Sequence, residues 1–270
     1  MSIHVEKHTL QTADAVMDYV TFGSGKKTLL MIQGLNTNGL QGAETLGWMY
    51  RIFAKEYRVY LFDRRRELPA DVTVEDLAAD MATAMDALGL TAADVIGVSQ
   101  GGMIAQILAI RRPDLVNRLV LAVTLSRSNA TVESVIENWI DLTEREDWKA
   151  LTADMAEKMY SEAYLGRYRP FLPLLAVLQK PKDPARFIAL ARACLSCGTY
   201  EELAKIQCPV FVIGGGQDKI VTAEASLEMA EKLGCECYLY ENLGHAAYEE
   251  AKDFNRRVCG FLQGMHPSAG

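Results

Sequence analysis

The chain has 270 residues, of which 50% are hydrophobic and 23% are charged. This length and composition indicate a globular protein with one large domain, or one domain with an insertion, and a sizeable core. The formal net charge of −7 argues against nucleic-acid binding, because phosphate contacts need a clustered basic surface. The one basic run, Arg64-Arg65-Arg66, stands beside Asp63 and Glu67, and we expect it to be a solvated loop face.

The first ten residues, MSIHVEKHTL, contain no basic segment followed by an apolar one, so we expect no secretory signal peptide. No apolar run approaches the roughly 18 residues that a membrane span needs, and we expect no membrane partner. The six cysteines are then expected to be reduced, mostly buried thiols of a cytoplasmic protein. Cys194 and Cys197 form a CxxC without a second pair at metal-site spacing, so a structural role is favoured over a redox or zinc role.

The predicted elements alternate along the chain. Residues 3–22 alternate loosely in polarity and end at GSGKK, which predicts an antiparallel hairpin. Six apolar runs follow that are too short for helices and suit parallel strands buried on both faces. They are TLLMIQG (28–34), YRVYLFD (57–63), DVIGVS (94–99), RLVLAVTL (118–125), PVFVIGG (209–215) and CECYLYE (235–241).

Helical patterns separate most of these runs. One begins after a capping box of Thr73 and Asp76 and ends at Gly89, a second covers about residues 103–110, and the last covers about 248–262. Alternating strands and helices predict a doubly wound α/β architecture with a mostly parallel twisted sheet flanked by helices.

One stretch interrupts this alternation. Residues 126–199 show helical periodicity without a strand signal and are rich in aromatic residues and methionine, after which Thr199 and Glu202 look like a capping box that restarts the core. We therefore expect a helical cap at 126–199, inserted into a core formed by residues 1–125 and 200–270. Individual cap side chains are expected mainly to pack on the core, with a subset lining a substrate pocket.

The segment GVSQGG places Ser99 within a GxSxG pattern, between a predicted strand and a predicted helix. At such a sharp turn the flanking positions must be small, and Gly97 and Gly101 meet this need. The turn projects the serine hydroxyl beyond the carboxyl edge of the sheet, where open α/β sheets bind ligands. The backbone N–H of Gln100 then lies at a helix N-terminus, where it can stabilise a developing negative charge.

A serine hydroxyl needs a base, and the chain has only four histidines. His4 and His8 fall in the predicted hairpin and His266 in the tail, where we expect exposed or packing roles. His245, in ENLGHAAYEE, follows the last predicted strand and should reach the same sheet edge as Ser99.

The base in turn needs a carboxylate to fix its tautomer. Asp218, in GGGQDKIV, follows the strand before that of the histidine and should lie at the same edge. Asp63 is the competing candidate, but we expect it to be a structural acid that pairs with the arginines after it.

The order Ser99, Asp218, His245 is that of the α/β-hydrolases. Through GVSQGG, GGGQDKIV and LGHAAYEE, the sequence resembles this superfamily over nearly its whole length, within the esterase, lactonase and peroxidase-like branch with a helical cap. The resemblance implies an acyl-enzyme mechanism, and it implies that the residue after a His-Gly pair is the second oxyanion donor. This chain has Gln33-Gly34 in place of that pair, so the backbone N–H of Leu35 is the expected donor.

The predicted function is hydrolysis of a small to medium carboxylic ester or lactone. Carbon–carbon bond hydrolysis and perhydrolysis use the same triad and remain alternatives, as does a non-enzymatic ligand receptor of the same fold. We expect a small-molecule acyl substrate, no cofactor and no metal, since the chain has neither a P-loop lysine motif nor a GxGxxG after a strand. The oligomeric state is left open between monomer and homodimer.

Overall fold

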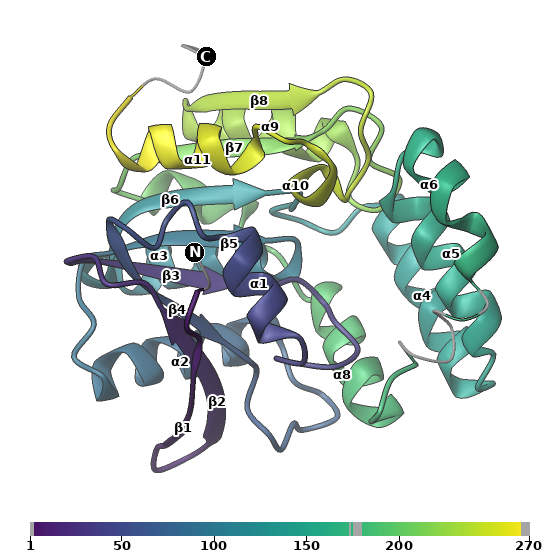
Figure 1. Ribbon diagram of the computed structural model, residues 1–270, viewed down its shortest axis with the longest axis horizontal. Helices are drawn as coiled ribbons and strands as arrows, with labels where there is room; N and C mark the ends of the chain where they lie inside the picture. Colours follow the sequence, from purple (N-terminus) through teal and green to yellow (C-terminus); the bar gives the residue numbers. More distant parts are fainter. Residues whose placement is uncertain (1–2, 173, 175–179, 266–270) are drawn as a thin grey trace.

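One twisted sheet of eight strands runs through the molecule in the order β1-β2-β4-β3-β5-β6-β7-β8 (Figure 1). The computed structural model describes residues 3–172, 174 and 180–265. The first two strands form the predicted antiparallel hairpin, β2 pairs antiparallel with β4, and all later neighbours are parallel. The strands are β1 (Glu6–Gln11), β2 (Val16–Phe22), β3 (Lys27–Ile32), β4 (Tyr57–Phe62), β5 (Ala93–Val98), β6 (Val116–Ala122), β7 (Val210–Gly215) and β8 (Glu236–Tyr240).

Helices cover both faces of this sheet and bury a separate apolar layer on each. On β3, Leu30 and Ile32 face one layer while Leu29 and Met31 face the other, which explains the continuous apolar run of a central parallel strand. The first layer is covered by α2 (Val74–Ala87), α3 (Gln100–Arg111) and α9 (Ala223–Leu233), and the second by α1 (Ala43–Met49), α10 (Ala247–Glu250) and α11 (Phe254–Leu262).

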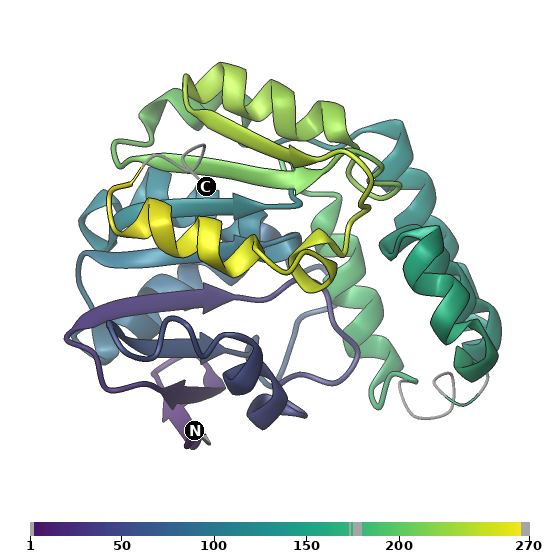
Figure 2. The same ribbon diagram turned by 45° about the horizontal axis from the view of Figure 1, so that its top comes forward.

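Between β6 and β7 the chain forms further helices at the carboxyl end of the parallel strands. Figures 1 and 2 show α4, α5 and α6 standing as a separate layer beyond the strand ends. These helices are α4 (Ala130–Glu144), α5 (Trp148–Met159), α6 (Glu162–Tyr168) and α8 (Pro184–Cys194), with a short 3₁₀ turn η2 (Arg169–Phe171). At the base of this segment, Arg127 and Gly198 form an isolated antiparallel bridge, and the Thr199 N–H donates to the Ser126 carbonyl at 2.8 Å.

The structure also contains 3₁₀ turns η1 (Pro113–Leu115) and η3 (Tyr200–Lys205), and the second of these corrects a prediction. Thr199 does not cap it with its side chain. Instead the Thr199 hydroxyl donates to Gln106 Oε1 at 2.6 Å, and the Glu202 carboxylate pairs with Arg111 at 2.8 Å. Both side chains are therefore taken by tertiary partners from α3.

The last predicted helix is also interrupted, because Ala251 takes an extended backbone with φ −78° and ψ 116°. The carboxylate of Glu250 accepts hydrogen bonds from the backbone N–H and the hydroxyl of Ser161, which fix α10 against the segment between β6 and β7. By contrast, the capping box at Thr73 and Asp76 is present as predicted.

Candidate active site

Ser99 occupies the turn between β5 and α3 in a strained backbone conformation, with φ 53° and ψ −120°. A positive φ is unfavourable for a residue with a side chain, so surrounding contacts must hold it. The Ser99 carbonyl accepts hydrogen bonds from Gly102 N–H at 2.8 Å and from the Thr124 hydroxyl at 2.7 Å. The start of α3 and the segment that follows β6 thus fix the turn from two sides.

The two glycines of the turn are needed for the reason that the sequence suggested. A Cβ on Gly101 would lie 2.0 Å from the Ile32 carbonyl oxygen, and one on Gly97 would lie 2.6 Å from the Gly101 carbonyl oxygen. Both obstacles are backbone atoms, which cannot swing aside as a flexible side chain can. The helix can therefore approach the sheet closely only because these positions lack side chains.

The loops after β5, β7 and β8 bring Ser99, Asp218 and His245 together. His245 Nδ1 lies 2.8 Å from Asp218 Oδ2, and His245 Nε2 lies 3.0 Å from Ser99 Oγ. An ionised carboxylate can only accept a hydrogen bond, so the ring carries its proton on Nδ1 and presents Nε2 as an acceptor to the serine. The three side chains thus form one relay from carboxylate to hydroxyl.

Asp218 is 8% exposed, and its second oxygen is held by the backbone. Its Oδ1 accepts from the N–H groups of Ile220 at 2.8 Å and Val221 at 3.0 Å. Burial alone would raise the pKa of this carboxyl, but the electrostatic interaction with the His245 ring, the hydrogen bond to it and the two amides outweigh burial and lower the pKa. The carboxylate therefore remains ionised beside the imidazole.

The loop after β3 passes close to the nucleophile. A Cβ on Gly34 would come 3.1 Å from Ser99 Cβ, and Leu35 lines the same small cavity of about 40 Å³ as Ser99 and His245. Gln100 is fully buried as the first residue of α3. The structure therefore brings both residues predicted to donate backbone N–H groups close to the serine.

A larger cavity, of about 650 Å³, adjoins this small one and shares Gly34, Leu35, Met155, Met159 and Tyr248 with it. One wall is the loop between β3 and α1, and the other comes from α5 and α6. In the wall from α5 and α6, the Tyr160 and Tyr164 rings stack with centroids 4.6 Å apart, and the tilted Tyr168 ring lies 4.5 Å from that of Tyr164.

The segment between β6 and β7 is hydrogen-bonded to two of the loops that carry the relay. The Gln100 side-chain amide donates to the Leu190 carbonyl on α8 at 2.6 Å. The Ala246 N–H, next to His245, donates to the Met159 carbonyl at the end of α5 at 2.8 Å. One contact is on the serine side of the relay and the other on the histidine side.

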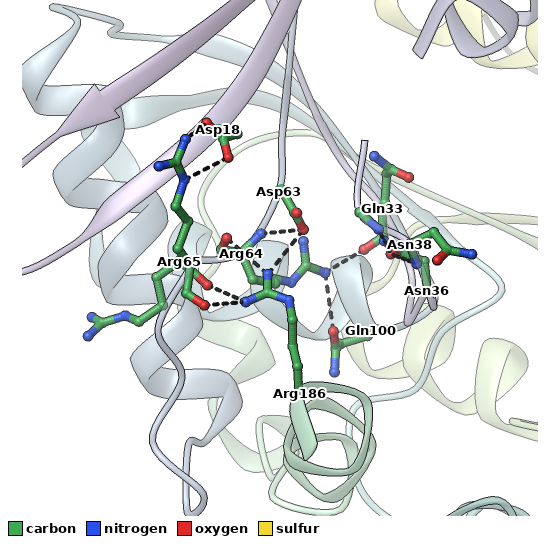
Figure 3. A network of polar contacts seen from close by, with 11 residues as sticks. Asp18, Gln33, Asn36, Asn38, Asp63, Arg64, Arg65, Gln100 and Arg186 are labelled. Carbon is green, nitrogen blue, oxygen red and sulfur yellow. Dashed lines mark hydrogen bonds and ion pairs between the residues drawn. The ribbon is translucent and has the colours of Figure 1, made fainter. Parts of the chain in front are cut away.

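In the basic run after β4, the prediction of a solvated face is wrong for Arg64, whereas Arg66 is exposed. Arg64 is only 4% exposed, and its guanidinium donates to the Gln33 carbonyl at 2.6 Å (Figure 3). Asp63 also differs from expectation: it accepts from the Arg64 backbone N–H at 2.8 Å and forms its ion pair with Arg186 of α8, at 3.4 Å. Segments distant in sequence enclose Arg64, so the local charge pattern of the run gave no sign of its burial.

Of the other reactive side chains, Cys194 lines the same small cavity as Ser99 and His245. All six cysteines are free, and burial raises the pKa of the Cys194 thiol to about 11, so it stays protonated at neutral pH. Within the described residues, no cluster of three or more potential ligands could hold a metal ion. His4 is exposed, His8 Nε2 lies 2.9 Å from the Thr21 hydroxyl, and His266 lies outside the described residues. Within the same described ranges, no helix is both long and apolar enough to cross a membrane.

The family profile of the alpha/beta hydrolase fold matches residues 27–252. A protein of Rhizobium rhizogenes named "Putative carbamate hydrolase RutD" is 24% identical over 274 residues, covering 97% of this chain and 98% of its own. The 3-oxoadipate enol-lactonase 2 of Acinetobacter baylyi is 23% identical over 226 residues, covering 80% and 81% of the two chains. Among solved structures, the enol-lactonase from Burkholderia xenovorans LB400 superposes with a TM-score of 0.83 at 21% identity, covering 95% of this chain and all of that one.

The sheet, its helices and this match to most of the chain define an α/β-hydrolase fold. The chain belongs to the α/β-hydrolase family and is an enzyme of the hydrolase class, as the sequence resemblance implied.

Proposed function

We propose that the protein is a serine hydrolase that cleaves an uncharged carboxylic ester or lactone of small to medium size through an acyl-enzyme. The observation that carries this proposal is the continuous relay from Asp218 through His245 to Ser99, with contacts of 2.8 and 3.0 Å. Three separate loops supply its members, and Ser99 keeps a strained backbone there, which a purely structural turn would not need.

In the proposed mechanism, His245 Nε2 takes the proton of Ser99 as Oγ attacks the substrate carbonyl carbon. The oxyanion that forms is stabilised by the backbone N–H groups of Leu35 and Gln100. The imidazolium, held by Asp218, then protonates the leaving alcohol. A water molecule, deprotonated by the same imidazole, then attacks the acyl carbon, and the imidazolium returns the proton to Ser99 Oγ as the acid is released.

The charge of the large cavity supports an uncharged substrate. Among the described residues that line it, none is lysine, arginine or histidine, and Glu249 is the one carboxylate. A buried anionic group would therefore lack a countercharge, which is costly in a partly apolar site. Residues 126–199 supply much of this wall, and we propose that they act as a cap that selects the substrate.

A fluorophosphonate probe tests the nucleophile. We expect the wild type to be labelled and Ser99→Ala to remain unlabelled, while Ser226→Ala, which alters a buried serine of α9, reacts like the wild type. Labelling that persists in Ser99→Ala would overturn the nucleophile assignment. Labelling without turnover of any substrate would favour a ligand receptor.

The substrate class is tested with p-nitrophenyl esters of increasing acyl length, a γ-lactone and an alkyl carbamate, the last because a relative carries a carbamate hydrolase name. We expect kcat/KM for p-nitrophenyl butyrate to exceed that for mono-p-nitrophenyl succinate by at least about tenfold, since only the second buries a carboxylate. Preference for the succinate would refute the charge argument. Turnover confined to β-diketones or to peroxide with an acid would favour carbon–carbon hydrolysis or perhydrolysis.

A further inference from the structure

Arg64 lies behind the proposed oxyanion site and is in contact with both chain segments that form it. The residue follows β4, and its terminal Nη2 donates to two acceptors, the Gln33 carbonyl at 2.6 Å and Gln100 Oε1 at 3.2 Å (Figure 3). Gln33 stands two residues before Leu35, and Gln100 carries the second proposed donor itself. One nitrogen of a planar side chain thus connects the two segments.

The surroundings of Arg64 hold the guanidinium in place. Gln100, which accepts from it, is held from the other side by the Leu190 carbonyl at 2.6 Å and by Cys194 Sγ at 3.2 Å. The Arg64 carbonyl accepts from Arg186 of α8 at 3.1 Å. Side chain and backbone of Arg64 are therefore fixed together, and the guanidinium cannot easily leave its two acceptors.

This arrangement is not one that stability alone would favour. Arg64 is almost fully buried, and its Nε has no hydrogen-bond partner among the described residues. A buried cation with an unused donor costs free energy, and an apolar side chain of similar volume often stabilises a fold more. Burial lowers the pKa of Arg64 to about 10, so the side chain keeps its charge at neutral pH.

We propose that Arg64 is a positioning residue that sets the separation of the Leu35 and Gln100 amides and so forms the oxyanion site. The inference rests on the proposed serine-hydrolase function and adds a residue that the nucleophile relay does not include. Arg64 acts through the Gln33 carbonyl and the Gln100 side chain, and no contact with the substrate is needed. Its effect should therefore fall on the transition state, in which the oxyanion exists, more than on substrate binding.

The variant Arg64→Met keeps length and apolar volume but removes the donors. Removing one oxyanion donor outright costs about 10²–10³ in kcat, so displacing the pair is expected to lower kcat on p-nitrophenyl butyrate by about 10–100-fold. KM should change by less than about threefold. Affinity for a trifluoromethyl ketone, which forms an oxyanion on the serine, should fall by the same factor as kcat/KM.

Arg66→Met is the matched control, because Arg66 belongs to the same run but forms an exposed ion pair with Asp18. Its kcat should equal that of the wild type. Arg64→Lys retains the charge but lacks the planar guanidinium, so its kcat should lie between those of the wild type and Arg64→Met. If Arg64→Met does not fold, Arg64→Lys replaces it in the comparison. An unchanged kcat in Arg64→Lys and Arg64→Met, an equal loss in Arg66→Met, or a loss borne wholly by KM would overturn the inference.

Hydrogen exchange gives a reading that does not depend on turnover. If Arg64 joins the two segments, Arg64→Met should speed amide exchange in residues 33–36 and 98–101 by about tenfold, and Arg66→Met should leave both unchanged. If the wild type reacted with neither the fluorophosphonate nor an ester, the proposed function would be wrong. The amide exchange rates would still show whether Arg64 positions these two segments. Unchanged exchange in both segments would refute the positioning role itself.

Discussion

Replacing Asp218 with asparagine changes one atom of the relay and little else. The side-chain oxygen of the Asp218→Asn variant can still accept from the N–H groups of Ile220 and Val221, now at 2.8 and 3.0 Å from Asp218 Oδ1. The amide nitrogen then stands where Oδ2 now lies, 2.8 Å from His245 Nδ1. Because an amide nitrogen donates, the ring must turn Nδ1 into an acceptor and carry its proton on Nε2.

That tautomer faces Ser99 with a donor in place of an acceptor, so the serine loses its base. We expect Asp218→Asn to lower kcat by about 10³–10⁴, which corresponds to about 4–5.5 kcal/mol of the barrier. The free energy of unfolding should change by less than about 1 kcal/mol, because both buried backbone amides keep their acceptor.

Asp218→Ala is the control for a structural role. It leaves the Ile220 and Val221 amides without an acceptor, at a cost of about 1–3 kcal/mol for each buried group. The measurements are kcat on p-nitrophenyl butyrate and urea unfolding of both variants. The reasoning fails if Asp218→Asn retains activity within tenfold of the wild type, or if asparagine destabilises the fold as much as alanine does.

Three further outcomes are expected. Gly101→Ala should destabilise the protein by about 3 kcal/mol or more in urea unfolding, since its Cβ would lie 2.0 Å from the Ile32 carbonyl oxygen. Gly166→Ala in α6 is the control: its Cβ would meet nothing within 4 Å, so it should be neutral or stabilising by up to about 1 kcal/mol. Equal changes in the free energy of unfolding for the two variants would contradict the close approach at Gly101. Thr73→Ala should cost about 1 kcal/mol, and no loss would dispute the capping box. The lowered pKa of Asp218 contributes stability that is complete above its unfolded pKa of about 4 and is lost as pH falls through the folded value. Between pH 5 and 2, the free energy of unfolding should therefore decrease less steeply for Asp218→Asn than for the wild type.

The sheet and the relay could be predicted because their signals are local. Each parallel strand is a short apolar run, and chemistry placed after such runs must meet at one edge of the sheet. Ser99, Asp218 and His245 each lie in the turn or loop that follows a parallel strand, so the topology brings them to the same edge of the sheet. The helical segment between β6 and β7 could also be predicted, because it interrupts the regular alternation of strand and helix patterns along the sequence.

The burial of Arg64 was not predictable, since its acceptors lie 31 and 36 residues away in sequence. A run of three arginines is usually solvated, and only the folded loops enclose the first of them. Thr199 likewise bears a good capping sequence, yet its hydroxyl is bound by Gln106. The helix α1 was not predicted either, because its seven residues, AETLGWM, are too few to show a clear period.

The hydrogen bonds from Gln100 to Leu190 and from Ala246 to Met159 limit how this hydrolase could be re-engineered. A foreign helical segment grafted between β6 and β7 would have to present backbone carbonyls at both places, or the serine and histidine loops would lose a support on either side. Exchange of the segment as a cassette should therefore cost turnover even where the graft folds. Point substitutions at Tyr160, Tyr164 and Tyr168, which line the large cavity, leave both hydrogen bonds in place. They are therefore the safer way to change the substrate preference.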